Sequence, residues 1–319
     1  MVNAPRFSWR FLLPQYWLLW LGVGLMWLIS WLPYRVLMLL GSAFGALLYQ
    51  LLGSRRKVAA RNIALCFPQM PAEEQQRLLK ANFAESGKAL FETIIGWWWP
   101  NWRIRKLAHF SGYEHIEAAL AQGKGVLLLA GHFLHLEAAC RVFGLTHPSV
   151  GFYRPHNNPL MDYLQYHGRN RANKYMVGKR DVKGLIQALD QQEVCFYLPD
   201  QDYGRNRAEF VPFFAVAETA TTTGTLLFAN AANCVVIPVY TYRLPGYQGY
   251  QVEVLPAFDH FPSGDDKADV TRVNQWVEQA VLKHPEQYMW LHRRFKTRPQ
   301  PDDPSLYKPE TPASANGRQ

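Results

Sequence analysis

One histidine and one carboxylate, His132 and Glu137, follow the apolar run 126–130 and are separated by four residues. In a single ideal helix these two side chains would point about 140° away from each other. They can therefore meet only if His132 lies on a loop before the helix and Glu137 lies in its first turn, where the helix dipole also favours a carboxylate. A carboxylate in that place would hold the imidazole in one tautomer and stabilise its protonated form. The pair predicts an oriented general base.

Two other interpretations of this segment stay open. A single histidine at the end of a strand is often a capping or core residue without a chemical role. His135 adds a third metal ligand type to His132 and Glu137, but the two histidines lack the four-residue step that places both on one helical face. We therefore expect no metal at this site.

The segments that would position these residues alternate between strand-like and helix-like patterns. Residues 126–130 are uninterruptedly apolar and follow a turn-like stretch at 122–125, which is typical of a buried strand in a parallel sheet. The alternation predicts an α/β fold with a mostly parallel central sheet covered by helices on both faces. We expect further strands at 149–153, 194–198 and 234–240, an edge strand at 250–255, and helices at 136–143, 160–173, 182–191, 221–232 and 270–283.

Polar residues follow the ends of the second and third expected strands. Arg154 comes directly after 149–153, and Asp200 and Asp202 follow 194–198. Because sites in open α/β sheets collect at the carboxyl ends of the strands, these side chains are candidates to join His132. Taken alone, Arg154 is typical of a solvated surface, and the two aspartates are typical of turns in which a side chain bonds the backbone.

Charge and composition favour contact with a membrane surface over contact with nucleic acid. The 319 residues are 49% hydrophobic, include 11 Trp and carry a formal net charge of +9. No acidic residue precedes Glu73, whereas seven basic residues do. Apolar runs separate these basic residues, which suits an anionic bilayer better than an RNA-binding fold. The four cysteines are widely spaced in apolar surroundings, as buried thiols in a reducing compartment are.

Residues 11–34 carry no charge and are long enough to span a bilayer, so we expect a retained N-terminal membrane anchor. A second apolar run at 36–53 is near the lower length limit, and it could span the membrane, lie in its interface or pack on the soluble domain. The expected organisation is an anchor and interfacial helix over 1–54, a catalytic domain over 55–298 and a disordered tail over 299–319, which is rich in Pro, Asp, Ser and Asn.

Six blocks of the sequence, in this order, resemble the late acyltransferases of lipid A biosynthesis, of the lauroyl and palmitoleoyl transferase type. The block 131–137, Gly-His-Phe-Leu-His-Leu-Glu, has the pattern of a histidine, four residues and an acid that many glycerolipid acyltransferases share. The other blocks make the resemblance specific, and the six together extend over almost the whole chain. They are 61–68, 153–155 with 158–159, 199–204, 210–215 with 220–224, and 285–296.

The resemblance implies an inner-membrane enzyme whose N-terminal helix is the anchor and whose catalytic domain lies at the cytoplasmic face. It would transfer a fatty acyl group, lauroyl as the first choice, from acyl carrier protein to the hydroxyl of a 3-hydroxyacyl chain on a Kdo-bearing tetra-acylated lipid A precursor. His132 and Glu137 would be the catalytic residues. By the same resemblance, Arg154 and Arg169 would contact phosphate or sugar carboxylate groups, while Asp200 and Asp202 would shape the site.

The alternatives are a palmitoleoyl or myristoyl transferase of the same pathway and a glycerolipid acyltransferase acting on lysophosphatidic acid. We expect no metal and no organic cofactor, because the thioester of the donor is already activated. The preferred chain length would depend on the depth of an apolar slot, at about 1–3 kcal/mol for each methylene. No pattern in the sequence reports that depth.

Overall fold

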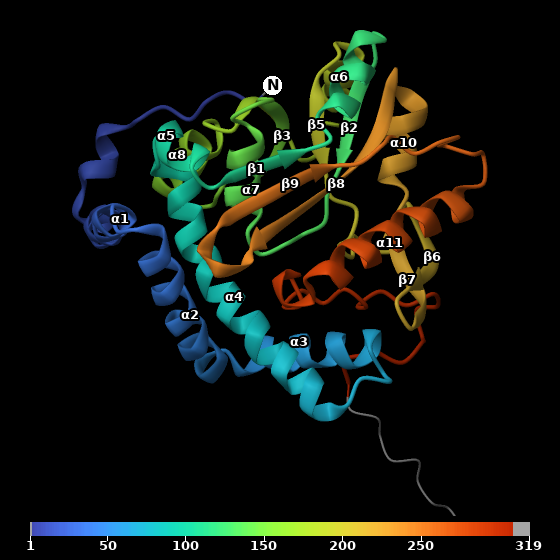
Figure 1. The fold of residues 1–319 in the computed structure, drawn as a ribbon, viewed down its shortest axis with the longest axis horizontal. Coiled ribbons are helices and arrows are strands. Elements are labelled where there is room, and N and C mark those ends of the chain that lie inside the picture. Colours follow the sequence, from blue (N-terminus) through green and yellow to red (C-terminus); the bar gives the residue numbers. More distant parts are fainter. Residues whose placement is uncertain (1, 309–319) are drawn as a thin grey trace, which may run out of the picture.

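The computed structural model describes residues 2–308, and its centre is a seven-stranded sheet with the order β1-β9-β8-β2-β5-β3-β4 (Figure 1). All neighbouring strands are parallel except β8 and β9. The predicted α/β fold with a mostly parallel sheet is therefore confirmed. The strands of this sheet are β1 (Ala108–Ser111), β2 (Gly125–Leu129), β3 (Ser149–Tyr153), β4 (Asn173–Gly178), β5 (Val194–Tyr197), β8 (Cys234–Leu244) and β9 (Gly249–Val254).

Helices cover both faces of the sheet, and the central strand β2 supplies both cores. Because successive side chains of a strand point to opposite faces, Leu127 and Leu129 belong to one hydrophobic cluster and Val126 and Leu128 to the other. The first cluster includes residues of α3 (Gly53–Cys66), α9 (Val182–Asp190), α10 (Gly224–Ala231) and α11 (Asp266–Lys283). The second includes residues of α4 (Ala72–Trp98), α6 (Glu114–Ala121) and α7 (Leu136–Phe143).

The structure corrects several predicted elements. The strand predicted at the edge, 250–255, is β9 and lies between β1 and β8, so that β1 is the edge strand. The helix predicted to reach residue 173 is α8 (Pro159–Arg169), and β4 follows it almost at once. The helix predicted from 221 begins at Gly224, because 221 and 222 belong to β7 (Val216–Thr222), which pairs with β6 (Ala208–Phe213) in a separate antiparallel hairpin.

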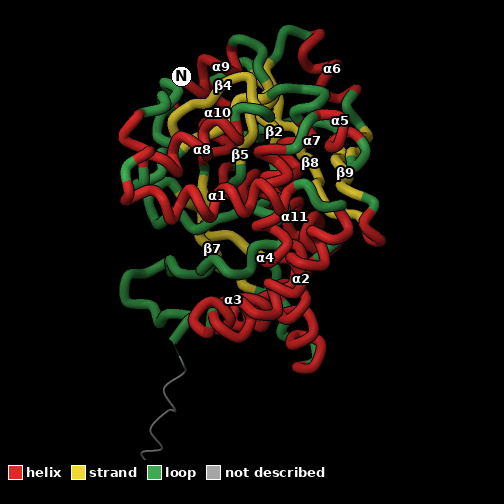
Figure 2. Tube along the Cα trace, turned by 90° about the vertical axis from the view of Figure 1, so that its left-hand side faces the viewer, coloured by secondary structure: helices red, strands yellow, loops and turns green. Residues whose placement is uncertain are grey.

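The apolar N-terminal region forms two helices, α1 (Trp17–Ser30) and α2 (Tyr34–Leu51), which lie along the outside of the domain (Figures 1 and 2). At the start of the anchor predicted over 11–34, two short 3-10 helices (Trp9–Leu12 and Pro14–Tyr16) precede α1. The 14 residues of α1 extend about 21 Å, less than the ~30 Å of a bilayer core. Several large apolar side chains of α1, including Leu18 and Leu21, are nevertheless exposed, which indicates membrane association. Within residues 2–308, one helix is long and apolar enough to cross a membrane, and it is α2.

Glycines let α2 pack closely on α4. A Cβ atom on Gly87 of α4 would lie 2.1 Å from the carbonyl oxygen of Gly41 and 2.3 Å from the amide nitrogen of Gly45, both in α2. These neighbours are backbone atoms, so no side chain can rotate to make room. The contact joins the candidate membrane helix to α4. Of the three alternatives left open for the run 36–53, this agrees with packing on the soluble domain.

We expect Gly87→Ala to destabilise the protein by about 1–3 kcal/mol through this overpacking. The measurement is thermal or denaturant unfolding of the detergent-solubilised protein. Gly24→Ala in α1 is the matched control, because a Cβ there would meet nothing within 4 Å and should leave stability unchanged or slightly raised. A melting temperature for Gly87→Ala equal to that of the control would contradict the close packing of α2 on α4.

A buried ion pair joins α4 to the sheet. Both carboxylate oxygens of Glu92 accept hydrogen bonds from the Arg243 guanidinium, each at 2.7 Å, and the Tyr250 hydroxyl donates to the same carboxylate at 2.8 Å. Glu92 is fully buried. This fixes the C-terminal half of α4, which carries Trp97, against β8 and β9.

Residues 299–308, predicted as the start of a disordered tail, lie against α3. The Arg61 side chain donates to the carbonyl oxygen of Leu306 at 2.6 Å, and the Tyr307 hydroxyl donates to Asn62 at 2.5 Å. The rest of the predicted tail, 309–319, lies outside the described residues. The domain boundaries at 54 and 298 stay predictions.

Candidate active site

His132 lies on the loop between β2 and α7, as predicted, and Asp200 holds it there. The His132 backbone N–H donates to one carboxylate oxygen of Asp200 at 2.8 Å, and its Nδ1 lies 2.6 Å from the other. Asp200 follows β5, the parallel neighbour of β2, so the carboxyl ends of the two strands bring both residues together. One carboxylate therefore fixes both the backbone and the ring of the histidine.

The surroundings of Asp200 keep its carboxylate ionised. Its side chain is buried, and the Tyr288 hydroxyl donates to Oδ2 at 2.9 Å. Burial alone would raise the pKa of Asp200, but the attraction of His132 and the hydrogen bonds from His132 and Tyr288 outweigh it, so that this pKa lies below its ordinary value. An ionised carboxylate can only accept, which assigns the Nδ1 proton to the imidazole and leaves Nε2 as the basic nitrogen.

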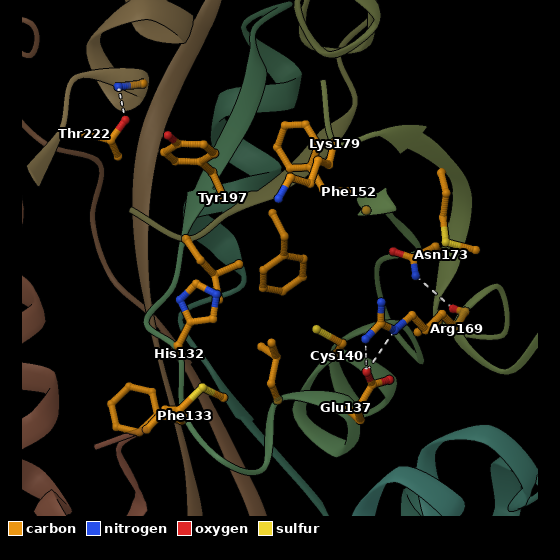
Figure 3. Close-up of a pocket in the computed structure, with 18 of the residues that line it drawn as sticks. His132, Phe133, Glu137, Cys140, Phe152, Arg169, Asn173, Lys179, Tyr197 and Thr222 are labelled. Carbon is orange, nitrogen blue, oxygen red and sulfur yellow. Dashed lines mark hydrogen bonds and ion pairs between the residues drawn. The ribbon is translucent and has the colours of Figure 1, made fainter. Parts of the chain in front are cut away.

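A cavity of about 690 Å³ lies beside His132 (Figure 3). Much of its wall is apolar, so an alkyl chain would gain free energy by entering it, at about 25 cal/mol for each Å² of apolar surface removed from water. The apolar lining residues include Leu134, Leu136, Phe152, Phe196, Leu227 and Phe228. Among the polar lining residues are Glu137, Arg169, Asn173, Lys179, Arg207 and Thr222.

Glu137 lines the same cavity, but its carboxylate bonds other partners. Arg169, the last residue of α8, donates to Glu137 Oε1 through Nε at 2.8 Å and also through Nη2, and the Trp97 indole donates to Oε2 at 3.1 Å. Burial disfavours the charge of Arg169, yet the adjacent carboxylate of Glu137 outweighs this and holds the pKa of Arg169 above its ordinary value. The carboxylate on the His132 ring is thus that of Asp200, where the sequence predicts that of Glu137. A direct catalytic role of Glu137 stays a prediction.

Three residues predicted to belong to the site, Arg154, Asp200 and Asp202, do not line the cavity, and of these Asp200 bonds the His132 ring. Arg154 is exposed at the end of β3. Asp202 is buried and accepts hydrogen bonds from the backbone N–H of Gly204 at 2.9 Å and from the N–H and hydroxyl of Thr297 at 2.7 and 2.8 Å. Asp202 therefore stabilises its own turn and joins it to the chain after α11, and it shapes the site only from outside.

A metal site built on both histidines finds no support in the structure. His135 is fully buried, and its Nε2 lies 3.3 Å from the Thr241 hydroxyl, away from the cavity lining. Burial lowers the pKa of His135 to about 4, which is typical of a neutral core histidine. Within residues 2–308, no group of three His, Cys, Asp or Glu side chains is arranged to hold a metal ion.

Sequence reasoning did not connect Trp97 with Glu137 or Tyr288 with Asp200, and it did not pair Asp200 with His132. Trp97 and Tyr288 lie 35 residues before and 156 residues after His132, so that no local spacing relates them to it. The order of the strands carries the missing information. Once β5 is known to be the neighbour of β2, an aspartate just after β5 becomes the natural partner of a histidine just after β2.

Comparison with known proteins finds similarity over nearly the whole chain. Residues 4–297 match the family model described as bacterial lipid A biosynthesis acyltransferase. The chain is 45% identical over 300 residues to the lipid A biosynthesis lauroyltransferase of Escherichia coli K12, covering 94% of this chain and 98% of that protein. It is 41% identical to the palmitoleoyltransferase of the same organism, covering 94% and 97%, and 44% identical to a lipid A biosynthesis acyltransferase of Haemophilus influenzae, covering 96% and 98%. Among solved structures, the 1-acyl-sn-glycerophosphate acyltransferase of Thermotoga maritima gives a TM-score of 0.38 at 14% identity, covering 80% of this chain and 97% of that chain.

Proposed function

The chain belongs to the family of bacterial lipid A biosynthesis acyltransferases, and from this premise we propose which acyl transfer it performs. The donor is acyl carrier protein carrying a fatty acyl thioester, with lauroyl as the preferred group. The acceptor is the hydroxyl of a 3-hydroxyacyl chain on a Kdo-bearing tetra-acylated lipid A precursor. The observation that carries this proposal is the basic Nε2 of His132 beside a largely apolar cavity of about 690 Å³, with Asp200 fixing Nδ1.

The reaction then needs two proton transfers, to and from His132, and the exchange of a C–S bond for a C–O bond. His132 Nε2 takes the proton of the acceptor hydroxyl while the hydroxyl oxygen attacks the thioester carbonyl carbon. The ionised Asp200 stabilises the imidazolium that forms. A C–O bond forms, the C–S bond breaks, and the departing thiolate takes the proton from Nε2, so that the products are the ester and the free thiol.

Glu137, Arg169 and Trp97 form one connected group on the cavity wall. We place them as residues that position the acceptor, since the Arg169 guanidinium remains next to the cavity while it balances Glu137. Asp202 stabilises the loop of Asp200 by accepting a hydrogen bond from the Thr297 backbone, outside the cavity. Arg154 is an exposed residue of the same sheet edge, and its contact with phosphate or carboxylate groups of the acceptor remains a proposal.

The proposed location is the cytoplasmic face of the inner membrane. Support comes from the exposed apolar surface of α1, from the candidate membrane helix α2, and from Arg55, Arg56 and Lys57, which follow α2 directly. Basic residues next to a membrane helix favour the cytoplasmic side.

The test is an acyl-transfer assay with purified enzyme in detergent or vesicles. Acyl carrier proteins loaded with lauroyl, myristoyl and palmitoleoyl groups serve as donors, and the product is identified by mass. We expect a penta-acylated product and the highest kcat/KM with lauroyl. A higher value with another donor would reassign the acyl chain. Transfer to lysophosphatidic acid but not to the lipid A precursor would refute the proposed acceptor.

A further inference from the structure

Lys179 and Arg207 are cationic residues that line the cavity and whose side chains have no partner among the described residues, whereas the Arg141 guanidinium, which also lines it, donates to Asn101. Lys179 comes from the loop between β4 and α9, and Arg207 from the loop between β5 and β6. In the described part of the chain, neither side chain forms an ion pair or a hydrogen bond, whereas Arg169 in the same cavity is bound to Glu137. Both residues are exposed to solvent, so the unpartnered charge that they add to the cavity is positive.

The positions of both residues are set by their surroundings. Figure 3 shows the Lys179 nitrogen on the cavity side, between the rings of Phe152 and Tyr197. Arg207 has a left-handed backbone, with φ of 56°, and its carbonyl oxygen accepts hydrogen bonds from the N–H and the hydroxyl of Thr223 at 2.9 and 3.2 Å. Thr223 also lines the cavity, so the loop of Arg207 is fixed to its wall.

We infer that Lys179 and Arg207 form a phosphate-binding subsite at the mouth of the cavity. This inference rests on the proposed function, in which a phosphate group accompanies both substrates: the phosphodiester of the donor's phosphopantetheine arm and the phosphates of the lipid A precursor. Lys and Arg side chains without carboxylate partners bind such groups by charge-assisted hydrogen bonds. The cavity residues beside these two cations, Phe152, Tyr197, Thr222 and Thr223, carry no charge that would compete.

The experiment compares wild type with Lys179→Met, Arg207→Met and the double variant. KM is measured for acyl-phosphopantetheine and for acyl-pantetheine, which lacks the phosphate, and for the acceptor with and without its phosphate groups. Each replacement should raise KM roughly tenfold for the substrate whose phosphate binds here. The increase should vanish when that phosphate is absent, and it should be smaller at high salt.

Lys183→Met is the matched control, because Lys183 is an exposed cation four positions from Lys179 that does not line the cavity. An increase confined to the phosphorylated donor assigns the subsite to the pantetheine arm, and one confined to the phosphorylated acceptor assigns it to the lipid headgroup. Unchanged KM values for a double variant that melts like wild type would overturn the inference while leaving the proposed function intact.

If wild type is inactive with every donor, a binding measurement tests the phosphate-binding subsite separately from the proposed acyl transfer. Calorimetric titration with inorganic phosphate needs no turnover. Weaker binding to the double variant than to wild type and Lys183→Met would still support the subsite. Equal binding to all three would refute it, whatever the reaction of the enzyme.

Discussion

Replacement of His132 by alanine is expected to lower kcat by a factor of about 10³–10⁴. A positioned general base accelerates a reaction by up to about this factor, and without it the attacking hydroxyl has no substitute acceptor for its proton. The imidazole is only partly buried, with 17% of its side chain exposed, and it faces the cavity, so its removal should cost little stability. KM should change far less than kcat, because the ring accepts the proton that is transferred during the reaction and does not bind the acyl chain or the headgroup.

The measurement is the rate of acyl transfer under saturating donor and acceptor, with thermal melting as the check on folding. His109→Ala is the matched control, because His109 is an exposed histidine of the edge strand β1 and lies outside the cavity. If folded His132→Ala retains a rate near that of the control, His132 is not the base, and the cavity described above is not the place of the reaction.

The second large effect is expected for Asp200→Asn, which should lower kcat by roughly 10³–10⁴, as loss of the correct tautomer does in hydrolytic triads. An asparagine can still accept the backbone N–H of His132 with its oxygen, but its NH₂ group would then face Nδ1 and donate to it. The imidazole proton would move to Nε2, which could no longer act as a base. The change of shape is minimal, so the variant separates tautomer control from packing.

Two further variants make the Asp200 result decisive. Asp202→Asn keeps the shape of the side chain but removes a carboxylate that bonds Gly204 and Thr297 and not the imidazole. It should therefore reduce the stability of the fold, with a smaller effect on kcat. Glu137→Gln tests the partner predicted from sequence. If Glu137→Gln loses most of the rate while Asp200→Asn keeps it, the carboxylate that orients His132 in the working enzyme is Glu137, and the assignment made from the structure fails.

The candidate site shows how far local patterns extend. The strand before His132 and the helix after it were predictable. A buried parallel strand and an amphipathic helix each have a characteristic hydrophobic pattern within a few neighbouring residues. The strands β3 and β5 were predictable for the same reason. The short strand β4 was not, because only three residues separate it from α8 and its apolar run is limited to 175–177, too short to be told apart from the end of a helix.

Local sequence patterns are sufficient to predict the alternation of strands and helices, the loop that carries His132, and the family to which the chain belongs. The carboxylate that meets the imidazole is known only from the fold. Glu137 is five positions from His132 and Asp200 is 68, yet the nearer residue pairs with Arg169 and the farther one pairs with the histidine. The reason is that parallel strands joined by long crossovers bring their carboxyl ends to one edge regardless of distance along the chain, and the order of those strands is set by the packing of both sheet faces.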